Sequence, residues 1–272
     1  MLSKTRDGNF TSSEIINLLS TTSRPMTEDE LKLHLADNPK SKKKNIDAWP
    51  GKAAVTYLNQ CNMERRLGRS LSDETNARPL TWGKLLESRA FNQLGLEYIL
   101  SSTETDQHPE IEYWAGSKDG IKYDKGQTIA DIKCPITLKS FCNLVDPIYE
   151  GLTGMDAMNK IRANHKDGEK YYWQLVSNAI ITGSKYAELI VYVPYKSELP
   201  EIKLMCDGEP NAYWISMAGE DELPFLIDGG YYKNLNIIRF EVPAEDKEHL
   251  TALVKKAGEM LIKNTVHELQ PA

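Results

Sequence analysis

The sequence predicts an α/β or α+β fold, a single domain over 1–272 in which helices pack on a central sheet. Three observations predict it. Apolar residues recur at helical spacing over much of the first 98 positions, glycine-punctuated strand-like runs occupy 111–133, and helical and strand-like segments then alternate to the end of the chain. A chain of 272 residues can bury a substantial core. We expect an N-terminal helical part at 1–80, a core at 81–195 and a peripheral part at 196–272.

The first part of the chain is expected to be helical. Helices are predicted at 12–20, 27–36, 52–66 and 82–98. Two of them open with the capping-box pattern, a threonine N-cap followed three residues later by a glutamate: Thr11 with Glu14, and Thr27 with Glu30. The polar, proline-containing stretch 37–50 is expected to be a loop.

The sheet is expected to begin after residue 110. Strands are predicted at 111–114, 120–123 and 128–133, where glycines mark the turns and Pro135 ends the third strand. After this strand we expect a helix at 137–144, a helix at 170–182 with Gly183 as its C-cap, and a strand at 188–193. A peripheral hairpin is expected in 201–232, with turn signals at Asp207-Gly208 and Asp228-Gly229. The chain is expected to end in a strand at 236–242 and an amphipathic helix at 243–263.

Composition excludes several classes of protein. Apolar residues make up 40% and charged residues 26%, which is ordinary for a globular protein. No apolar run approaches the roughly 18 residues of a membrane helix, and the N-terminus lacks the apolar stretch of a signal peptide. We therefore expect a cytoplasmic protein with no membrane partner. The four cysteines form no CxxC pair, so we expect reduced thiols rather than a zinc site, an iron–sulfur cluster or a disulfide framework.

The formal net charge of −6 does not exclude a nucleic-acid partner. Binding in a groove depends on local phosphate neutralisation and not on the total charge. Lysines and arginines do cluster at 40–44 and 65–69. For the lysine run at 40–44, we prefer the interpretation as a solvated face or a loop.

The chemically informative residues lie at 116–135. Residues i and i+2 of a strand point to the same face, so Asp131 and Lys133 should project together while Ile132 points into the core. Asp119, at a turn one strand earlier, is placed to reach the same point. Two carboxylates and a backbone carbonyl suit Mg²⁺, and a nearby lysine can stabilise negative charge developing on a phosphorus centre. The alternatives are an exposed ion pair for Asp131 and Lys133, and an ordinary hairpin turn at Asp119-Gly120.

Three further features favour the site. Glu87 lies on a helix with Phe91 one turn later, an apolar setting for an acid without a function. Tyr171, Gln174 and Asn178 share one helical face at spacing i, i+3 and i+7. In addition, Arg6 and Ser13 bracket a predicted helix N-terminus, where free N–H groups favour an anion.

These pieces, in this order, resemble the PD-(D/E)xK nuclease superfamily and, within it, the lambda-type exonuclease (YqaJ-type viral recombinase) family. The matching segments are RDGNFTSSE at 6–14, WGKLLE at 82–87, GSKDGI at 116–121, DIKCP at 131–135 and YYWQ at 171–174. The resemblance extends from Arg6 to about Tyr195. It implies a restriction-endonuclease-like fold, with a central mixed sheet flanked by helices and a catalytic core at 81–195.

The resemblance also implies a function and a site. The function is Mg²⁺-dependent digestion of linear double-stranded DNA from 5′ ends, which leaves 3′ single-stranded overhangs for phage-type recombination, with Mn²⁺ as a substitute metal. The implied catalytic residues are Glu87, Asp119, Asp131, Lys133 and Gln174. The implied metal ligands are Asp119, Asp131, the carbonyl of Ile132 and, for a second metal or its water, Glu87. The implied contacts to the 5′-phosphate and the DNA are Arg6, Ser13, Ser117, Lys139 and Tyr171.

The partners implied are DNA ends, a single-strand annealing protein and further copies of the chain in a trimeric ring. The sequence departs from the family at three positions. Lys118 stands in place of proline, Lys139 in place of arginine, which removes the bidentate fork, and Val176 in place of a second glutamine. Two alternatives stay open: an endonuclease or other DNA-processing nuclease of the same superfamily, and a DNA-end-binding protein without catalysis.

Overall fold

The computed structural model describes residues 6–71, 77–101, 105–206 and 209–262. Its α-helices are α1 (Glu28–Asp37), α2 (Lys52–Leu67), α3 (Arg78–Asn92), α4 (Leu138–Tyr149), α5 (Gly154–Asn164), α6 (Gly168–Thr182), α7 (Leu199–Leu204), α8 (Tyr213–Met217) and α9 (Ala244–Gly258). Its 3-10 helices are η1 (Ile15–Leu19), η2 (Lys196–Glu198), η3 (Pro210–Ala212) and η4 (Glu220–Glu222). Its strands are β1 (Phe10–Thr11), β2 (Thr22–Pro25), β3 (Asn45–Ala48), β4 (Tyr98–Leu100), β5 (Asp106–Gln107), β6 (Trp114–Gly116), β7 (Gly120–Lys122), β8 (Thr128–Lys133), β9 (Tyr186–Tyr192) and β10 (Leu235–Glu241).

The central sheet is mixed, in the strand order β10-β9-β8-β7-β4. The strands β8 and β9 are parallel, with Asp131 opposite Leu189, and the other neighbours are antiparallel. A parallel pair needs a long crossover. Here α4, α5 and α6 provide it, and α6 then contacts both strands that it connects.

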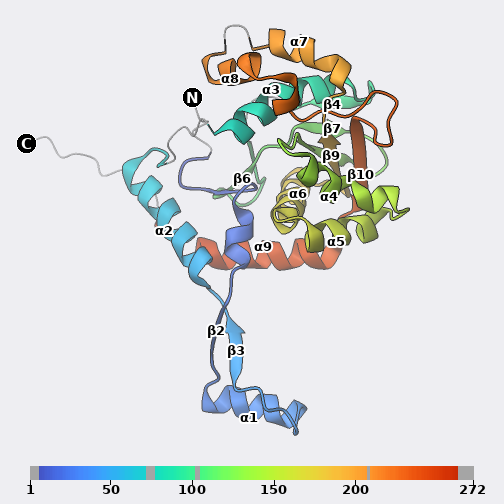
Figure 1. Cartoon of the computed structure of the whole chain (residues 1–272). Helices are drawn as coiled ribbons and strands as arrows, with labels where there is room; N and C mark the ends of the chain where they lie inside the picture. Colours follow the sequence, from blue (N-terminus) through green and yellow to red (C-terminus); the bar gives the residue numbers. More distant parts are fainter. Residues whose placement is uncertain (1–5, 72–76, 102–104, 207–208, 263–272) are drawn as a thin grey trace, which may run out of the picture.

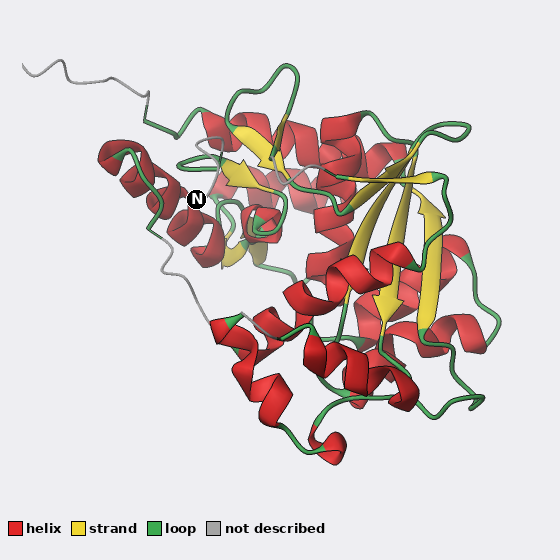
Figure 2. Cartoon of the chain, turned by 90° about the horizontal axis from the view of Figure 1, so that it is seen from above, coloured by secondary structure: helices red, strands yellow, loops and turns green. Residues whose placement is uncertain are grey.

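Helices cover both faces of this sheet (Figure 2). On one face, Ile129 and Leu189 belong to a core that includes residues of α4, α5, α6 and α9. On the other face, Ala130, Ile132 and Ile190 pack with residues of α3, α7 and α8. Burial on both faces explains why β9 is apolar along most of its length. The predicted fold class, helices flanking a central mixed sheet, is confirmed.

The N-terminal segment lies beside the central sheet as part of a second, three-stranded sheet in the order β1-β6-β5. The strands β1 and β6 are parallel, with Thr11 opposite Ala115. Buried hydroxyls fix this segment to α6, because the Ser12 and Ser177 Oγ atoms lie 2.8 Å apart and Trp114 Nε1 donates to Ser177 Oγ at 2.8 Å. The segment that begins at Arg6 is thereby held next to the turn that carries Ser117 and Asp119.

An arm projects from the body between η1 and α2 (Figure 1). Its stem is the antiparallel ribbon of β2 and β3, in which Thr22 pairs with Ala48 and Pro25 with Asn45. The helix α1 lies at its far end and has no buried residue. The capping box predicted for this helix is confirmed, since Thr27 and Glu30 make both reciprocal bonds. The loop predicted over 37–50 is wrong at its C-terminal end, where β3 forms.

Other local predictions were also corrected by long-range contacts. The capping box at Thr11 is wrong: Thr11 lies in β1 with its N–H donating to Tyr57 Oη at 2.8 Å, and the helix that follows is the short η1, which starts after Glu14. The helix predicted over 82–98 runs instead over α3 and ends at Asn92, because Tyr98 begins β4 and pairs with Lys122.

The hairpin predicted over 201–232 is wrong for the described residues. The segment forms α7, η3 and α8, and Ile202, Ala212 and Ile215 pack into the core on the α3 face of the sheet. Of its two expected turn signals, Gly229 does adopt a left-handed conformation, with φ 69°, while Asp207 and Gly208 lie outside the described residues. The end of the predicted C-terminal helix, residue 263, also lies outside them, and α9 ends at Gly258.

Several predicted elements have nearly the bounds expected of them, and α5 was not predicted at all. The strand β8 begins and ends where predicted, and α6 ends at Gly183, a left-handed C-cap with φ 71°. The strand predicted at 111–114 is displaced to β6, since Ile111 accepts a turn hydrogen bond from Trp114 before pairing begins. In the described part of the chain, no helix combines the length and the apolar character needed to cross a membrane.

Candidate active site

The two aspartates meet where β7 and β8 begin to pair. The Asp119 N–H donates to the carbonyl of Ala130 at 3.1 Å, and its Oδ2 accepts from the N–H of Ile132 at 2.6 Å. The turn before β7 is therefore tied to β8 on both sides of Asp131. Because Asp131 and Lys133 alternate with the core residue Ile132, both side chains lie on the α6 face of the sheet, as the spacing predicts.

The ammonium group of Lys133 is surrounded by two side-chain oxygens and an aromatic ring. Its Nζ is 2.6 Å from Asp131 Oδ2 and 3.4 Å from Gln174 Oε1, and it sits 5.1 Å from the centre of the Tyr171 ring. Burial lowers the pKa of Lys133, but the charges of Asp131 and Asp119 outweigh burial, and the net shift is upward. The side chain is therefore an ammonium ion at neutral pH, suited to stabilising an anion.

The polar face of α6 positions Asp131 and the turn before Asp119. Gln174 Nε2 donates to Asp131 Oδ1 at 2.8 Å, and Asn178 Nδ2 donates to the Ser117 carbonyl at 2.9 Å. The other oxygen, Asp131 Oδ2, is buried and has no aligned hydrogen-bond donor, although the Lys133 ammonium lies near it. This oxygen is therefore paired with the ammonium of Lys133, 2.6 Å away, and a carboxylate oxygen has a second lone pair that can accept a further cation.

The acids of the site repel one another. Burial raises the pKa of Asp119 to about 8, and the charges of Asp131 and Glu87 add to this shift, while Lys133 and the Ile132 N–H oppose it. Burial also raises the pKa of Glu87, together with the charge of Asp131. Three carboxylates near one another in a partly buried site are destabilised unless a cation or protons compensate them.

The arrangement fits a divalent metal ion in part. Within the described ranges, no group of three or more His, Cys, Asp or Glu side chains is close enough to form a complete metal site by itself. Mg²⁺ commonly takes only one or two carboxylates and keeps several waters. Asp119, Asp131 and the Ile132 carbonyl match that requirement, and Asp131 Oδ2, which is paired with the Lys133 ammonium, has a further lone pair that a metal ion could use.

The residues assigned to the phosphate pocket are only partly brought together. Arg6 Nη2 donates to Ser13 Oγ at 3.4 Å, and the pairing of β1 with β6 holds this segment beside Ser117. Lys139 is exposed in the first turn of α4, and among the described residues no hydrogen bond or ion pair links it to Arg6 or Ser13. Lys118 forms an ion pair with Asp106, which is 40% exposed, so this lysine already has a counter-ion on the protein.

Two groups of residues near the site were not expected from the sequence. The Tyr57 hydroxyl, from α2, lies 3.4 Å from Thr11 Oγ1, which in turn lies 3.4 Å from Ser13 Oγ. His165 stacks on Tyr171 with ring centres 5.5 Å apart, and its Nε2 lies 2.7 Å from Ser140 Oγ. Since an isolated tyrosine or histidine has no local signature, only the tertiary structure identifies them.

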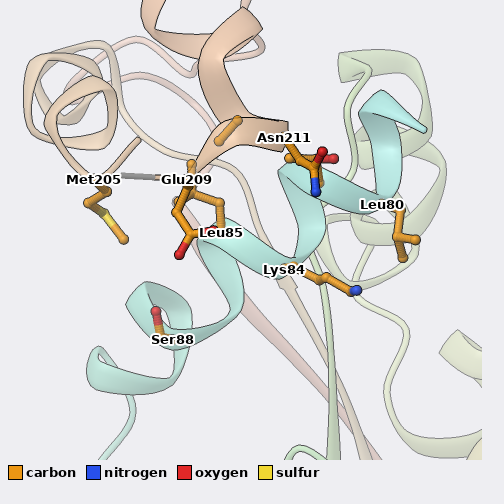
Figure 3. Close-up of a pocket in the computed structure, with 9 residues that line it drawn as sticks. Leu80, Lys84, Leu85, Ser88, Met205, Glu209 and Asn211 are labelled. Atoms are coloured by element: carbon orange, nitrogen blue, oxygen red, sulfur yellow. The ribbon is translucent and has the colours of Figure 1, made fainter. Parts of the chain in front are cut away.

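A separate pocket of about 420 Å³ lies between α3 and the segment from α7 to η3 (Figure 3). It is lined by Leu80, Thr81, Lys84, Leu85, Ser88, Met205, Glu209, Asn211 and Ala212. None of these residues belongs to the predicted site. The acids and Lys133, and not this pocket, are therefore the candidate catalytic centre.

Comparison with known proteins shows similarity at the level of the fold. No protein-family model matches the chain, and no curated protein matches it in sequence. The structure is similar to that of LHK-Exo, an alkaline exonuclease from Laribacter hongkongensis, in complex with dAMP, with a TM-score of 0.53 and 15% identity over 94% of this chain and 90% of that chain. It is also similar to a phage-related exonuclease from Haemophilus somnus 129PT, with a TM-score of 0.53 and 12% identity over 93% and 92% of the two chains. The chain thus has the restriction-endonuclease-like fold of these exonucleases.

Proposed function

We propose that the protein is a Mg²⁺-dependent exonuclease that digests linear double-stranded DNA from its 5′ ends and leaves 3′ single-stranded overhangs. The observation that carries the proposal is the convergence of Asp119, Asp131 and Lys133 at one end of β8, with Gln174 bonded to Asp131. The shared fold with two exonucleases supports the nuclease class. The resemblance of the sequence motifs to lambda-type exonucleases supports the direction of digestion.

Each protein group has a separate role in this proposal. Asp119, Asp131 and the Ile132 carbonyl would hold Mg²⁺, with Glu87 beside them, and a bound Mg²⁺ would activate water and polarise the phosphate. Lys133 donates hydrogen bonds to the negative charge that develops on the phosphate oxygens. Gln174 holds the Asp131 carboxylate in place, and Tyr171 supports the ammonium of Lys133 through its ring.

The central experiment compares linear and covalently closed circular duplex, each with and without Mg²⁺. We expect nucleotides to be released from the linear DNA only, and only with the metal. Asp119→Asn and Lys133→Met should abolish the release, whereas the control Asp221→Asn, at an exposed residue outside the site and the arm, should not. Cleavage of the circle would favour the endonuclease alternative, and activity that survives both site variants would refute the assignment of the site.

Direction and end recognition need a second assay. A duplex labelled on one strand only should lose label from its 5′ end, and a 5′-phosphate should speed digestion relative to a 5′-hydroxyl. Arg6→Ala should remove that preference because it removes the guanidinium beside Ser13. Equal rates on the two ends in the unaltered protein would eliminate the phosphate pocket from the proposal.

The family resemblance adds three expectations about assembly, partner and biological role to the proposal. They are a homo-oligomer, in the form of a trimeric ring, a single-strand annealing protein as partner, and a role in phage-type recombination in the cytoplasm of a bacterial host. Light scattering of the purified protein tests the first. A mass equal to that of one 30.8 kDa chain would contradict it.

A further inference from the structure

The arm formed by β2, α1 and β3 contributes little to the core of the protein. Its helix α1 buries no residue, and exposed leucines on it include Leu33, at 69% exposure. Two-stranded ribbons and single short helices are marginal in water by themselves. The arm is nonetheless held in a defined shape by its own polar contacts, which indicates a function outside the fold.

The lysines of the arm are gathered on one loop, residues 40–44, which we call the lysine loop. Lys40, Lys42, Lys43 and Lys44 are all exposed, and no acidic residue occurs between Asn38 and Ile46. Among the described residues, no carboxylate lies within ion-pair distance of any of these four ammonium groups, whereas Arg24 and Lys32 of the same arm do have acidic neighbours.

The lysine loop is folded back on α1 and is not a loose tail. His34 Nε2 lies 2.8 Å from Ser41 Oγ, and the Lys43 N–H donates to the same hydroxyl at 3.2 Å. The Ser41 N–H donates to the Asn38 carbonyl, and the Met26 N–H to the carbonyl of Lys44. Because the loop is bonded to both the helix and the ribbon, its four charges are displayed together. A chain with a net charge of −6 thus presents a local cationic surface away from its body.

The root of the arm is connected to the candidate phosphate pocket. A groove of about 530 Å³ at this root is lined mostly by polar residues: Asn17, Ser20, Lys52, Ala53, Thr56, Tyr57 and Gln60. At one end, the Gly51 N–H donates to the Ser20 carbonyl, next to the base of the ribbon. At the other end, Tyr57 carries the hydroxyl that bonds Thr11, beside Ser13 and Arg6. Polar groups therefore continue from Arg6 and Ser13 past α2 to the root of the arm, where Lys52 adds one positive charge.

We propose that the lysine loop binds the phosphate backbone of the duplex DNA on which the site acts. The proposal rests on the proposed function and extends it to a second contact. The ligand that fits is a polyanion with regularly spaced charges, because four exposed ammonium groups gathered on one loop attract phosphates through charge, whatever the base sequence. The contact holds the substrate irrespective of its sequence, while the site removes nucleotides from the end.

The test measures binding of a fluorescein-labelled duplex of about 40 base pairs by anisotropy in EDTA, over a range of salt concentrations. The variant is the triple substitution Lys42→Gln, Lys43→Gln and Lys44→Gln. The matched control replaces Lys125, Lys233 and Lys255 by Gln, three exposed lysines without ion pairs among the described residues. Each lost phosphate contact lowers the slope of log K against log salt by about 0.9. We expect the slope to fall by about 2 to 3 in the variant and to stay unchanged in the control.

Two further measurements separate this contact from the site and from the fold. At saturating DNA, kcat for Mg²⁺-dependent digestion should equal that of the unaltered protein, while KM rises at least several-fold. A second variant replaces residues 23–47 by two glycines, which can join Thr22 to Ala48 because these residues are paired neighbours in the ribbon. It should show the same loss of binding with an unchanged Tm.

Unchanged affinity and salt slope in both arm variants would overturn the proposal, as would an equal loss in the control. A change of oligomeric mass on removal of the lysines, seen by light scattering, would also overturn it, since the arm would then be a contact between copies. If the unaltered protein binds DNA through the arm but digests none with Mg²⁺ or Mn²⁺, the proposed function fails and the arm proposal stands.

Discussion

Asp119→Asn should stabilise the metal-free protein while it abolishes the nuclease activity. The asparagine keeps the size of the side chain and an oxygen that can accept from the Ile132 N–H, at 2.6 Å in the structure. It removes the negative charge that burial and the neighbouring acids, Asp131 and Glu87, disfavour. The variant therefore separates the cost of the charge to the fold from its role at the site.

The pH dependence follows from the raised pKa of Asp119, about 8 in the folded protein against 3.8 for the free side chain. Between these values the folded state holds a proton that the unfolded chain releases. The stability from this group is present at acidic pH and is lost as the pH rises through about 8. One proton corresponds to about 1.4 kcal/mol per pH unit. From pH 6 to pH 8, the advantage of the variant over the unaltered protein should widen by about 2 to 3 kcal/mol.

The assay is urea unfolding in EDTA at pH 6, 7 and 8, with Asp37→Asn as the control because Asp37 is exposed. Groups far from the site contribute equally in both proteins, so the difference between them reports on Asp119 and its interaction with the neighbouring acids, Asp131 and Glu87. A second series with Mg²⁺ should raise the stability of the unaltered protein more than that of the variant, because the metal compensates the charge. A gap that stays constant over this pH range would refute the reasoning on Asp119.

Substitutions at three residues test individual contacts. Lys133→Met should lower the rate of digestion by at least about 100-fold, because the charge of Lys133 acts on the reacting phosphate. The circular dichroism spectrum should stay unchanged. A smaller loss of rate in kinetic assays would argue against that role. Gln174→Ala removes the hydrogen bond to Asp131 and should lower kcat about tenfold to 100-fold. Gln174→Glu should lower kcat by at least as much, because a carboxylate cannot donate this bond. Full activity in either variant would contradict the positioning role. Glu188→Gln should cost about 3 to 5 kcal/mol in urea unfolding, since it removes the buried carboxylate charge that pairs with the ammonium of Lys122, 3.0 Å away and 13% exposed. A loss below about 1 kcal/mol would show that the amide oxygen and the Tyr98 hydroxyl compensate the ammonium.

Much of the candidate site could be predicted from the sequence because its geometry is local. The alternation of a strand brings Asp131 and Lys133 to one face, and the 3.6-residue period of a helix aligns Gln174 with Asn178. The short turn before β7 brings Asp119 to within a hydrogen bond of the neighbouring strand. These relations depend on a few consecutive residues, so they do not require knowledge of the rest of the chain.

Other features could be decided only by contacts between distant segments. Thr11 has the sequence of a helix cap, yet pairing with β6 and a bond to Tyr57 place it in a strand. The segment 201–232 contains turn signals, yet its apolar residues reach the α3 face of the sheet only as short helices. In these cases burial and pairing outweigh local preferences, which differ by only about 1 kcal/mol or less per residue.

The sequence by itself determined which chemical groups are available: the three acids, the ammonium group and the order of the elements that carry them. The tertiary structure decided which of these groups meet. It paired Asp131 Oδ2 with the Lys133 ammonium, left Lys139 exposed, paired Lys118 with Asp106, and placed the lysine loop on an arm away from the core (Figure 1). The physical reason is that the free energy of a buried charge depends on all neighbours within a few ångströms, and these neighbours come from segments that no local pattern connects.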